Sequence, residues 1–229
     1  MILSDIRDFL FPRFCKVCGK KLVPSEQHLC INCLRMVPRT HFEDNPFNPM
    51  MQKFMGDIVI RRASAWFFYE KGHAYARLIH HTKYFDHPDV GRYLGRCAAT
   101  SMKESGFFDG IDGIISVPLS RRRRQKRGYN QCDYIAQGIS EIAGIPVMNG
   151  YLVRTHDNPT QTHRGKADRQ TNVQNIFAVK NPEVLKSLTL LLIDDVVTTG
   201  ATLRSCAATL EASVPDINIV AFTLAYAND

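Results

Sequence analysis

Long apolar runs are missing from this chain of 229 residues. The densest one, Leu188 to Ile193, has the length of a strand and stops at two aspartates, whereas a membrane-spanning helix needs about 20 apolar residues. The N-terminal residues carry Asp5 and Asp8, where a secretory signal needs an uninterrupted apolar stretch. We therefore expect a cytoplasmic protein without a membrane span.

An excess of acidic residues is missing too. The chain has 29 Lys and Arg against 22 Asp and Glu, a net charge of +7 and a pI of about 9.1. Hydrophobic residues make up 45% and charged residues 22%, which is typical of a globular protein and excludes a disordered or fibrous one. The positive surplus indicates a polyanionic partner, which is a nucleic acid, a phosphorylated small molecule or an acidic membrane surface.

Four of the seven cysteines form two Cys-x-x-Cys pairs, Cys15/Cys18 and Cys30/Cys33. Two such turns supply the four thiolates of a tetrahedral zinc ion, and a closed site of this kind is structural. Redox pairs and chance pairing are the alternatives. We predict a zinc-ribbon-like module over residues 1–45, which the metal would help to fold, and a larger domain over residues 46–229.

The larger domain alternates short apolar strands with helices, which indicates an α/β fold with a mainly parallel sheet flanked by helices. The predicted strands are 58–69, 113–117, 145–153, 189–193 and 217–224. The predicted helices are 72–83, 90–102, 130–143 and 200–212. A basic loop precedes the third helix, and residues 154–175 read as a long polar loop.

The segment from Leu190 to Leu203, LLLIDDVVTTGATL, carries the most chemistry. An apolar strand ends in Asp194 and Asp195, and a threonine-rich turn then leads into a helix, whose N-terminal N–H groups bind anions. Carboxylates accept hydrogen bonds from vicinal hydroxyls and hold Mg²⁺ through water. The combination predicts a sugar-phosphate site, against the alternative of a solvated strand end. The P-loop pattern G-x-x-x-x-G-K-[ST] is missing, which argues against a nucleoside triphosphatase of that class.

This segment resembles the signature of the type I phosphoribosyltransferases for 5-phosphoribosyl 1-diphosphate. The resemblance implies that fold, with Asp194 and Asp195 on the ribose hydroxyls at the catalytic centre. It implies a phosphate loop made of the residues Thr198, Thr199, Gly200, Ala201 and Thr202.

The cysteine pairs ahead of such a domain resemble one subgroup, the ComF family of competence-associated proteins, which also includes GntX-type proteins. Further matches are Lys83-Tyr84, Ser116–Leu119 and Arg127–Gln131. The polar loop also matches at Gln161, Arg164, Arg169, Asn172 and Phe177.

The resemblance also assigns the leaving group. Pro118, Leu119 and Ser120 would bind pyrophosphate together with Mg²⁺, and Arg164, Lys166 and Arg169 would supply cations from a loop that closes over the reaction centre. Residues 154–175 are otherwise a solvated surface loop.

Two functions follow from different classes. One is a phosphoribosyltransferase that moves phosphoribose from the diphosphate to a nitrogen acceptor, which the residues do not identify. The other is a non-catalytic accessory protein of single-stranded DNA uptake in natural competence, working with a DNA-translocating helicase, as the family resemblance implies.

The positive charge is concentrated in one segment. Six cations lie within seven residues: Arg121, Arg122, Arg123, Arg124, Lys126 and Arg127. Without them, residues 46–229 have a net charge of −1. The segment predicts a local phosphate partner, either a nucleic acid or the pyrophosphate of the small ligand, and a solvated charge run is the alternative.

Overall fold

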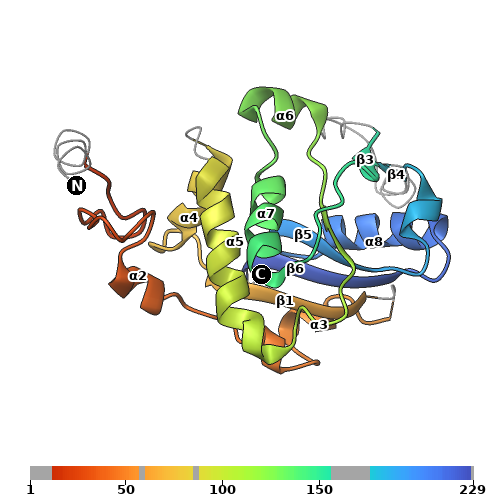
Figure 1. The fold of residues 1–229 in the computed structure, drawn as a ribbon, viewed down its shortest axis with the longest axis horizontal. Coiled ribbons are helices and arrows are strands. Elements are labelled where there is room, and N and C mark those ends of the chain that lie inside the picture. Colours follow the sequence, from red (N-terminus) through yellow and green to blue (C-terminus); the bar gives the residue numbers. More distant parts are fainter. Residues whose placement is uncertain (1–11, 57–59, 85–87, 156–175, 228–229) are drawn as a thin grey trace, which may run out of the picture.

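The structure is a computed structural model that describes residues 12–56, 60–84, 88–155 and 176–227. Its central sheet has four parallel strands in the order β1-β6-β5-β2 (Figure 1). They are β1 (Ile60–Tyr69), β2 (Gly113–Ser116), β5 (Thr189–Val197) and β6 (Asn218–Ala227). All four lie where strands were expected: β1 within the β-branched and aromatic stretch 58–69, and the others on short apolar runs. Burial on both faces is the reason for the apolar sequence of β2 and of most of β5 and β6.

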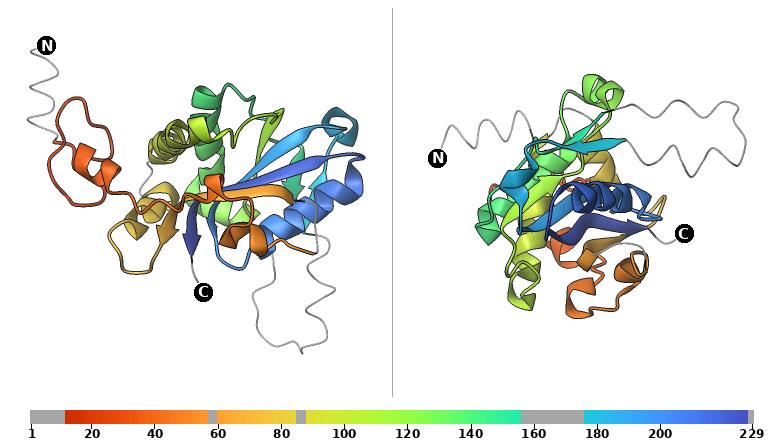
Figure 2. Two further views of the ribbon diagram at one scale, coloured as in Figure 1. Left: turned by 90° about the horizontal axis from the view of Figure 1, so that it is seen from below. Right: turned by 90° about the vertical axis from the view of Figure 1, so that its right-hand side faces the viewer.

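Alternate residues of β5 point to two separate cores. Leu191 and Ile193 pack with the helices α4 (Ala76–Lys83), α5 (Pro88–Met102) and α7 (Gln131–Ala143). Leu190 and Leu192 pack with α8 (Ala201–Ser213) and α3 (Pro49–Gln52). The two sets of helices therefore cover opposite faces of the sheet, as Figure 2 shows in the view from below.

Helices α5 and α7 pack closely because glycines lie where they meet. A Cβ on Gly95 would lie 2.3 Å from the carbonyl oxygen of Ile135, and a Cβ on Gly138 would lie 2.0 Å from that of Arg92. This close approach packs α7 against the core. The first residues of α7 lie at the edge of the sheet where β5 ends.

The strand predicted over residues 145–153 was wrong in its extent. Only Val147 continues the parallel sheet, as a single bridge to Ile114. Pro146 has no N–H to donate, and Gly150 turns the chain with a φ of 97°. The chain then enters β3 (Leu152–Arg154), which pairs antiparallel with β4 (Phe177–Val179) in a second, two-stranded sheet.

The basic segment, predicted as a loop, is a helix, α6 (Arg121–Arg127). The side-chain oxygen of Ser120 accepts from the N–H of Arg123 at 3.3 Å, and Gly128 ends the helix in the left-handed region. Arginine, lysine and glutamine are good helix formers, so caps at both ends suffice. Residues 121–126 are exposed, and the helix projects at the top of Figure 1.

The N-terminal cysteine module contains α2 (Ile31–Arg35) and contacts α4 and α5. The hydroxyl of Tyr75 donates to the carbonyl oxygen of Cys33 at 2.8 Å, and the guanidinium of Arg77 donates to that of Val17 at 3.3 Å. Residues 38–40 then pair with β1 along its outer edge. The division at residue 45 stays a prediction.

Three short 3₁₀ helices complete the described elements: η1 (Phe42–Asp44), η2 (Lys103–Ser105) and η4 (Pro182–Leu185). Across the described residues, we find no helix whose length and apolar character would let it cross a membrane.

Candidate functional site

The acid pair lies inside β5, toward its carboxyl end, because β5 continues through Val197. Asp195 is 5% exposed, and Asp194 is partly buried. The backbone N–H of Asp195 and the thiol of Cys132 both donate to Oδ1 of Asp194, at 2.8 and 3.6 Å. The pair is therefore held by the protein before any ligand arrives.

Two further side chains hold Asp195. The ammonium of Lys83 lies 3.0 Å from Oδ2 of Asp195, and the amide of Gln131 donates to the same oxygen at 2.6 Å. Lys83 ends α4, whereas Gln131 begins α7, so three elements meet at one carboxylate. In the described contacts Oδ2 of Asp194 and Oδ1 of Asp195 are not engaged, and they are the acceptors left for a ligand.

The sequence pattern placed Lys83 and Gln131 among the family matches but gave them no role at the site. The signal that pointed to them was the family match itself, at Lys83-Tyr84 and Arg127–Gln131. Their approach to Asp195 depends on how α4 and α7 pack, which local sequence does not contain.

Burial and the charge of Asp195 raise the pKa of Asp194 from 3.8 to about 7. Burial, followed by the charges of Asp194 and Asp195, also raises the pKa of the Cys132 thiol, which keeps it a neutral donor. Near neutral pH the carboxyl group of Asp194 is therefore partly protonated, and ligands that favour the carboxylate compete with that proton.

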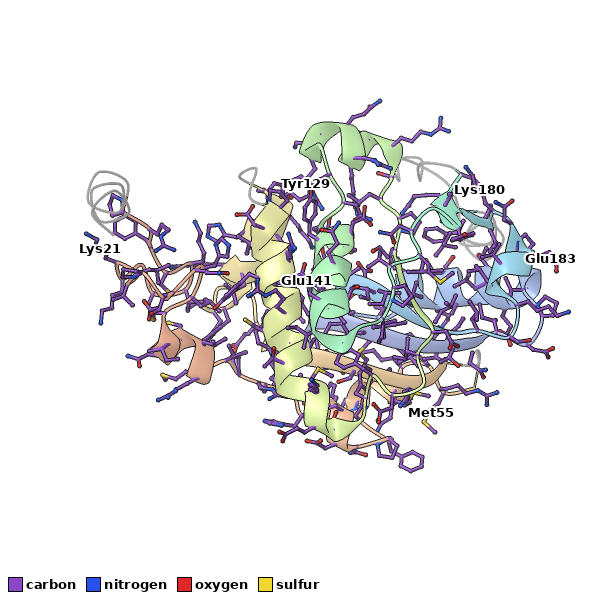
Figure 3. The ribbon with its side chains drawn as sticks, viewed as in Figure 1. Lys21, Met55, Tyr129, Glu141, Lys180 and Glu183 are labelled. Atoms are coloured by element: carbon purple, nitrogen blue, oxygen red, sulfur yellow. The ribbon has the colours of Figure 1, made fainter. Side chains whose placement is uncertain are left out.

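The connection between α6 and α7 ties the site to the C-terminal end of α4. The hydroxyl of Tyr129, which lies between α6 and α7 in Figure 3, donates to the carbonyl oxygen of Thr82 at 3.0 Å. Arg127 donates to the side chain of Gln131 and lies over the ring of Tyr84 at 5.6 Å. Arg127, at the end of the basic helix, is thus linked to Asp195 through Gln131.

The threonine turn follows β5 directly. Thr198 and Thr199 are exposed, and so are Ala201 and Thr202 at the start of α8. Gly200 is buried with a φ of 78°, and a Cβ there would lie 2.9 Å from Cε1 of Phe54. The predicted phosphate loop therefore presents its hydroxyls to solvent while its glycine packs against the protein.

The segment predicted for pyrophosphate leaves the same edge of the sheet. The N–H of Val117 donates to the carbonyl oxygen of Ile193 at 2.8 Å, so Pro118, Leu119 and Ser120 begin beside the acid pair. The amide of Asn130, at the start of α7, donates to the carbonyl oxygen of Val117 at 3.1 Å and fixes the segment from the other side. Arg164, Lys166 and Arg169 lie outside the described residues.

The four cysteines of the N-terminal module converge. The sulfur atoms of Cys15, Cys18, Cys30 and Cys33 all lie within 4.8 Å of one another. Burial raises the pKa of Cys15, but backbone N–H donors outweigh it and lower that pKa from 9.0 to about 7. Four soft ligand atoms that converge in this way fit a structural metal ion.

The solved structures that resemble this chain are distant from it in sequence. No family model matches the chain. The allosteric regulatory enzyme of purine biosynthesis is 20% identical with a TM-score of 0.42, over 62% of this chain and 30% of that one. Adenine phosphoribosyltransferase from Saccharomyces cerevisiae is 12% identical with a TM-score of 0.39, over 61% of this chain and 69% of that one.

Curated relatives match more strongly in sequence. DNA utilization protein YhgH of Salmonella typhi is 30% identical over 136 residues, which are 58% of this chain and 59% of that protein. Competence protein ComFC of Bacillus subtilis is 32% identical over 111 residues, 48% of this chain and 43% of that one. Competence protein F of Haemophilus influenzae is 31% identical over 206 residues, which cover 85% of this chain and 76% of that protein.

The predicted fold class, a type I phosphoribosyltransferase fold with a zinc-ribbon-like module, agrees with the parallel sheet, its flanking helices and the four-cysteine cluster. The match to competence protein F covers 85% of this chain and 76% of that protein. On that match, the protein belongs to the ComF family.

Proposed function

We propose that the protein binds 5-phosphoribosyl 1-diphosphate with Mg²⁺ and transfers its phosphoribosyl group to a nitrogen acceptor. The main support is one juxtaposition: two held carboxylates inside β5 are followed at once by an exposed threonine turn at the N-terminus of α8. A sugar phosphate has hydroxyls that can donate to the carboxylates and a phosphate anion that can bind in the threonine turn.

The ribose hydroxyls would donate to Oδ2 of Asp194 and Oδ1 of Asp195, the two oxygens that the described contacts leave free. The 5-phosphate would accept from the hydroxyls of Thr198, Thr199 and Thr202 and from N–H groups at the start of α8. Lys83 would orient Asp195 and balance its negative charge, because its ammonium lies 3.0 Å away.

Pyrophosphate would lie against residues 118–120, which begin next to the acid pair. In the transfer the C1–O bond breaks and its electron pair leaves with pyrophosphate. The acceptor nitrogen forms the C1–N bond and gives up a proton. Carboxylate oxygens are ligands that suit Mg²⁺. When bound, the ion would neutralise negative charge on the departing pyrophosphate. Arg164, Lys166 and Arg169 are proposed to add cationic donors to the same group.

The proposal includes a structural Zn²⁺ on the four cysteines. The cluster has no open position for chemistry, so the ion would stabilise the module and not react.

A second candidate function is an accessory role in single-stranded DNA uptake beside a DNA-translocating helicase. Two observations favour it. Relatives carry the names competence protein and DNA utilization protein. Five of the six cations of α6 are also exposed, next to the proposed pyrophosphate segment, and Arg127 is half-buried.

Calorimetric titration with 5-phosphoribosyl 1-diphosphate and Mg²⁺ tests the first proposal. Wild type should bind with measurable heat, and Asp194→Asn/Asp195→Asn should lose at least tenfold in affinity. Glu211→Gln is the matched control, since it neutralises an exposed acid at the far end of α8. No heat with wild type would refute the proposal.

Pyrophosphate release separates the two candidates. A transferase should release pyrophosphate with at least one member of a panel of nucleobases and amines. Binding without release across the whole panel would favour the accessory role.

A further inference from the structure

A cavity of about 430 Å³ lies between residues 34–39, at the end of the cysteine module, and α5. Its walls come from α2 and the segment after it, from β1, from α5 and from the end of α7. Trp66, on its β1 wall, is separated from β5 by β6, so the cavity is a different site from the acid pair.

The charge of this cavity has one sign. Arg35, Arg39 and Arg96 line it, and no acidic residue does. Arg39 is paired with Glu43, which is almost fully buried. For Arg35 and Arg96, the described residues offer no carboxylate within ion-pair distance. Two guanidinium groups are therefore left to neutralise a ligand, which matches the charge of a phosphate dianion.

The rest of the cavity is mostly aromatic and apolar, apart from the hydroxyl side chains of Thr100 and Ser101. Trp66 is 2% exposed, and its indole N–H is already used, donating to Oγ of Ser101 at 2.9 Å. Tyr93 and Cys97 lie one turn apart on α5, and Ile142 closes the end on α7. Burial raises the pKa of Tyr93, so its ring keeps a neutral hydroxyl. Because Trp66 is buried, the half-buried ring of Tyr93 offers the flat packing surface, while the arginines supply the charged donors.

We propose that this cavity binds a mononucleotide, with its phosphate on Arg35 and Arg96 and its base against the aromatic wall. The volume lies within the range of small-molecule sites, about 300–1,000 Å³. Guanidinium groups bind phosphate through paired N–H donors, and a planar base suits a tyrosine wall. This inference does not depend on the proposed transferase activity.

The protein contains a single tryptophan, and it lines the cavity, so its fluorescence reports on this site. AMP, GMP and UMP are titrated into the full chain. We expect a saturable change in Trp66 emission, and at least tenfold weaker binding of inorganic phosphate and of adenosine, each of which lacks half of the recognised chemistry.

Two variants on one helix make the test specific. Arg96→Gln should weaken mononucleotide binding at least tenfold. Arg92→Gln, one turn earlier on α5, should leave it unchanged, because Arg92 is exposed, pairs with Glu141 and does not line the cavity. Equal affinities in these two variants, or no saturable change in wild type, would overturn the proposal.

The remaining outcomes are distinct. Inorganic phosphate as strong as AMP would overturn the base contact. A response only to a single-stranded oligonucleotide would overturn a small-molecule site. Asp194→Asn/Asp195→Asn should still bind mononucleotide here, so failure of the phosphoribosyl proposal and failure of this one give different results.

Discussion

The carboxyl group of Asp194 is held in an unfavourable place. It is partly buried beside a second carboxylate, which raises its pKa to about 7. The unfolded chain, with a pKa of 3.8 at this group, loses the proton first as the pH rises. The contribution of Asp194 to stability therefore falls between about pH 4 and pH 7 and is level above that.

Asp194→Asn removes this repulsion. We expect it to raise the free energy of unfolding by about 1–2 kcal/mol at pH 8, with a gain near zero at about pH 4, while ligand binding is lost. Urea unfolding at about pH 4, 6 and 8 measures this, with Glu211→Gln as the control. A gain that did not grow with pH would contradict the account.

Lys83 is the second residue with a measurable role. Lys83→Met leaves the buried carboxylate of Asp195 with only the amide of Gln131 on Oδ2, and we expect a loss of about 1–2 kcal/mol at pH 7, reduced by the partial exposure of Lys83. Lys83→Met/Asp195→Asn should recover most of it. A double variant as unstable as the single one would show that the ion pair is not the cause.

At the level of elements, the turn between β5 and α8 depends on a glycine with two separate constraints. Gly200 has a φ of 78° and meets the ring of Phe54. Gly144, at the end of α7, has a similar φ of 74°, and a Cβ added there would have no neighbouring atom within 4 Å. The two glycines therefore separate backbone strain from a clash.

Gly144→Ala should cost about 1 kcal/mol, from left-handed backbone strain alone. Gly200→Ala should cost clearly more, about 2–3 kcal/mol, and should weaken binding of 5-phosphoribosyl 1-diphosphate, because the turn must shift away from Phe54. Thermal unfolding and calorimetry measure the two effects. An equal loss of stability in the two variants would show that the ring of Phe54 moves aside and that the clash is absent.

Helix α6 carries the prediction for nucleic acid. If it binds single-stranded DNA, Arg122→Ala/Arg123→Ala should reduce the slope of log K against log salt by about 1.4. Lys180→Ala/Lys186→Ala, which removes the same charge from exposed positions elsewhere, should not. Equal slopes in the two double variants would sink a DNA role for α6.

The elements that the sequence predicted well are those whose signal is local. Strand β6 and the first half of β5 are largely apolar runs, although β5 continues through the acid pair to Val197 and not to residue 193 as expected. The acid pair and the threonine turn are two residues apart in the chain, so their meeting at one place needed no tertiary information. Helix α6 was missed because a run of charges has no apolar period, although Ser120 and Gly128 mark both of its ends. The contacts of Lys83 and Gln131 were out of reach, since each depends on how separate helices pack onto the sheet.

For the whole molecule, the cysteine module shares one core with the larger domain. Cys15, Leu29 and Val37 belong to the same buried cluster as Leu94 on α5 and Phe222 on β6. We therefore expect loss of a bound metal to lower the stability of the whole molecule and not only of the first residues.

Elemental analysis should find about one equivalent of zinc, and Cys30→Ser should abolish it and lower the melting temperature of the whole chain in one transition. Cys97→Ser, which lies outside the cluster, should keep the zinc. Less than half an equivalent in wild type purified without chelator would contradict the metal assignment.

The pairing of residues 38–40 with β1 has a consequence for handling the protein. A strand at the edge of a sheet carries unpaired N–H and C=O groups that recruit other chains. Here the carbonyl oxygen of Pro38 accepts from Phe68 at 2.9 Å, and the N–H of Thr40 donates to Trp66 at 3.2 Å, which occupies part of that edge. If the four cysteines bind zinc as proposed, chelation that frees residues 38–40 should expose this edge, and we expect faster self-association of the protein in the presence of a chelator.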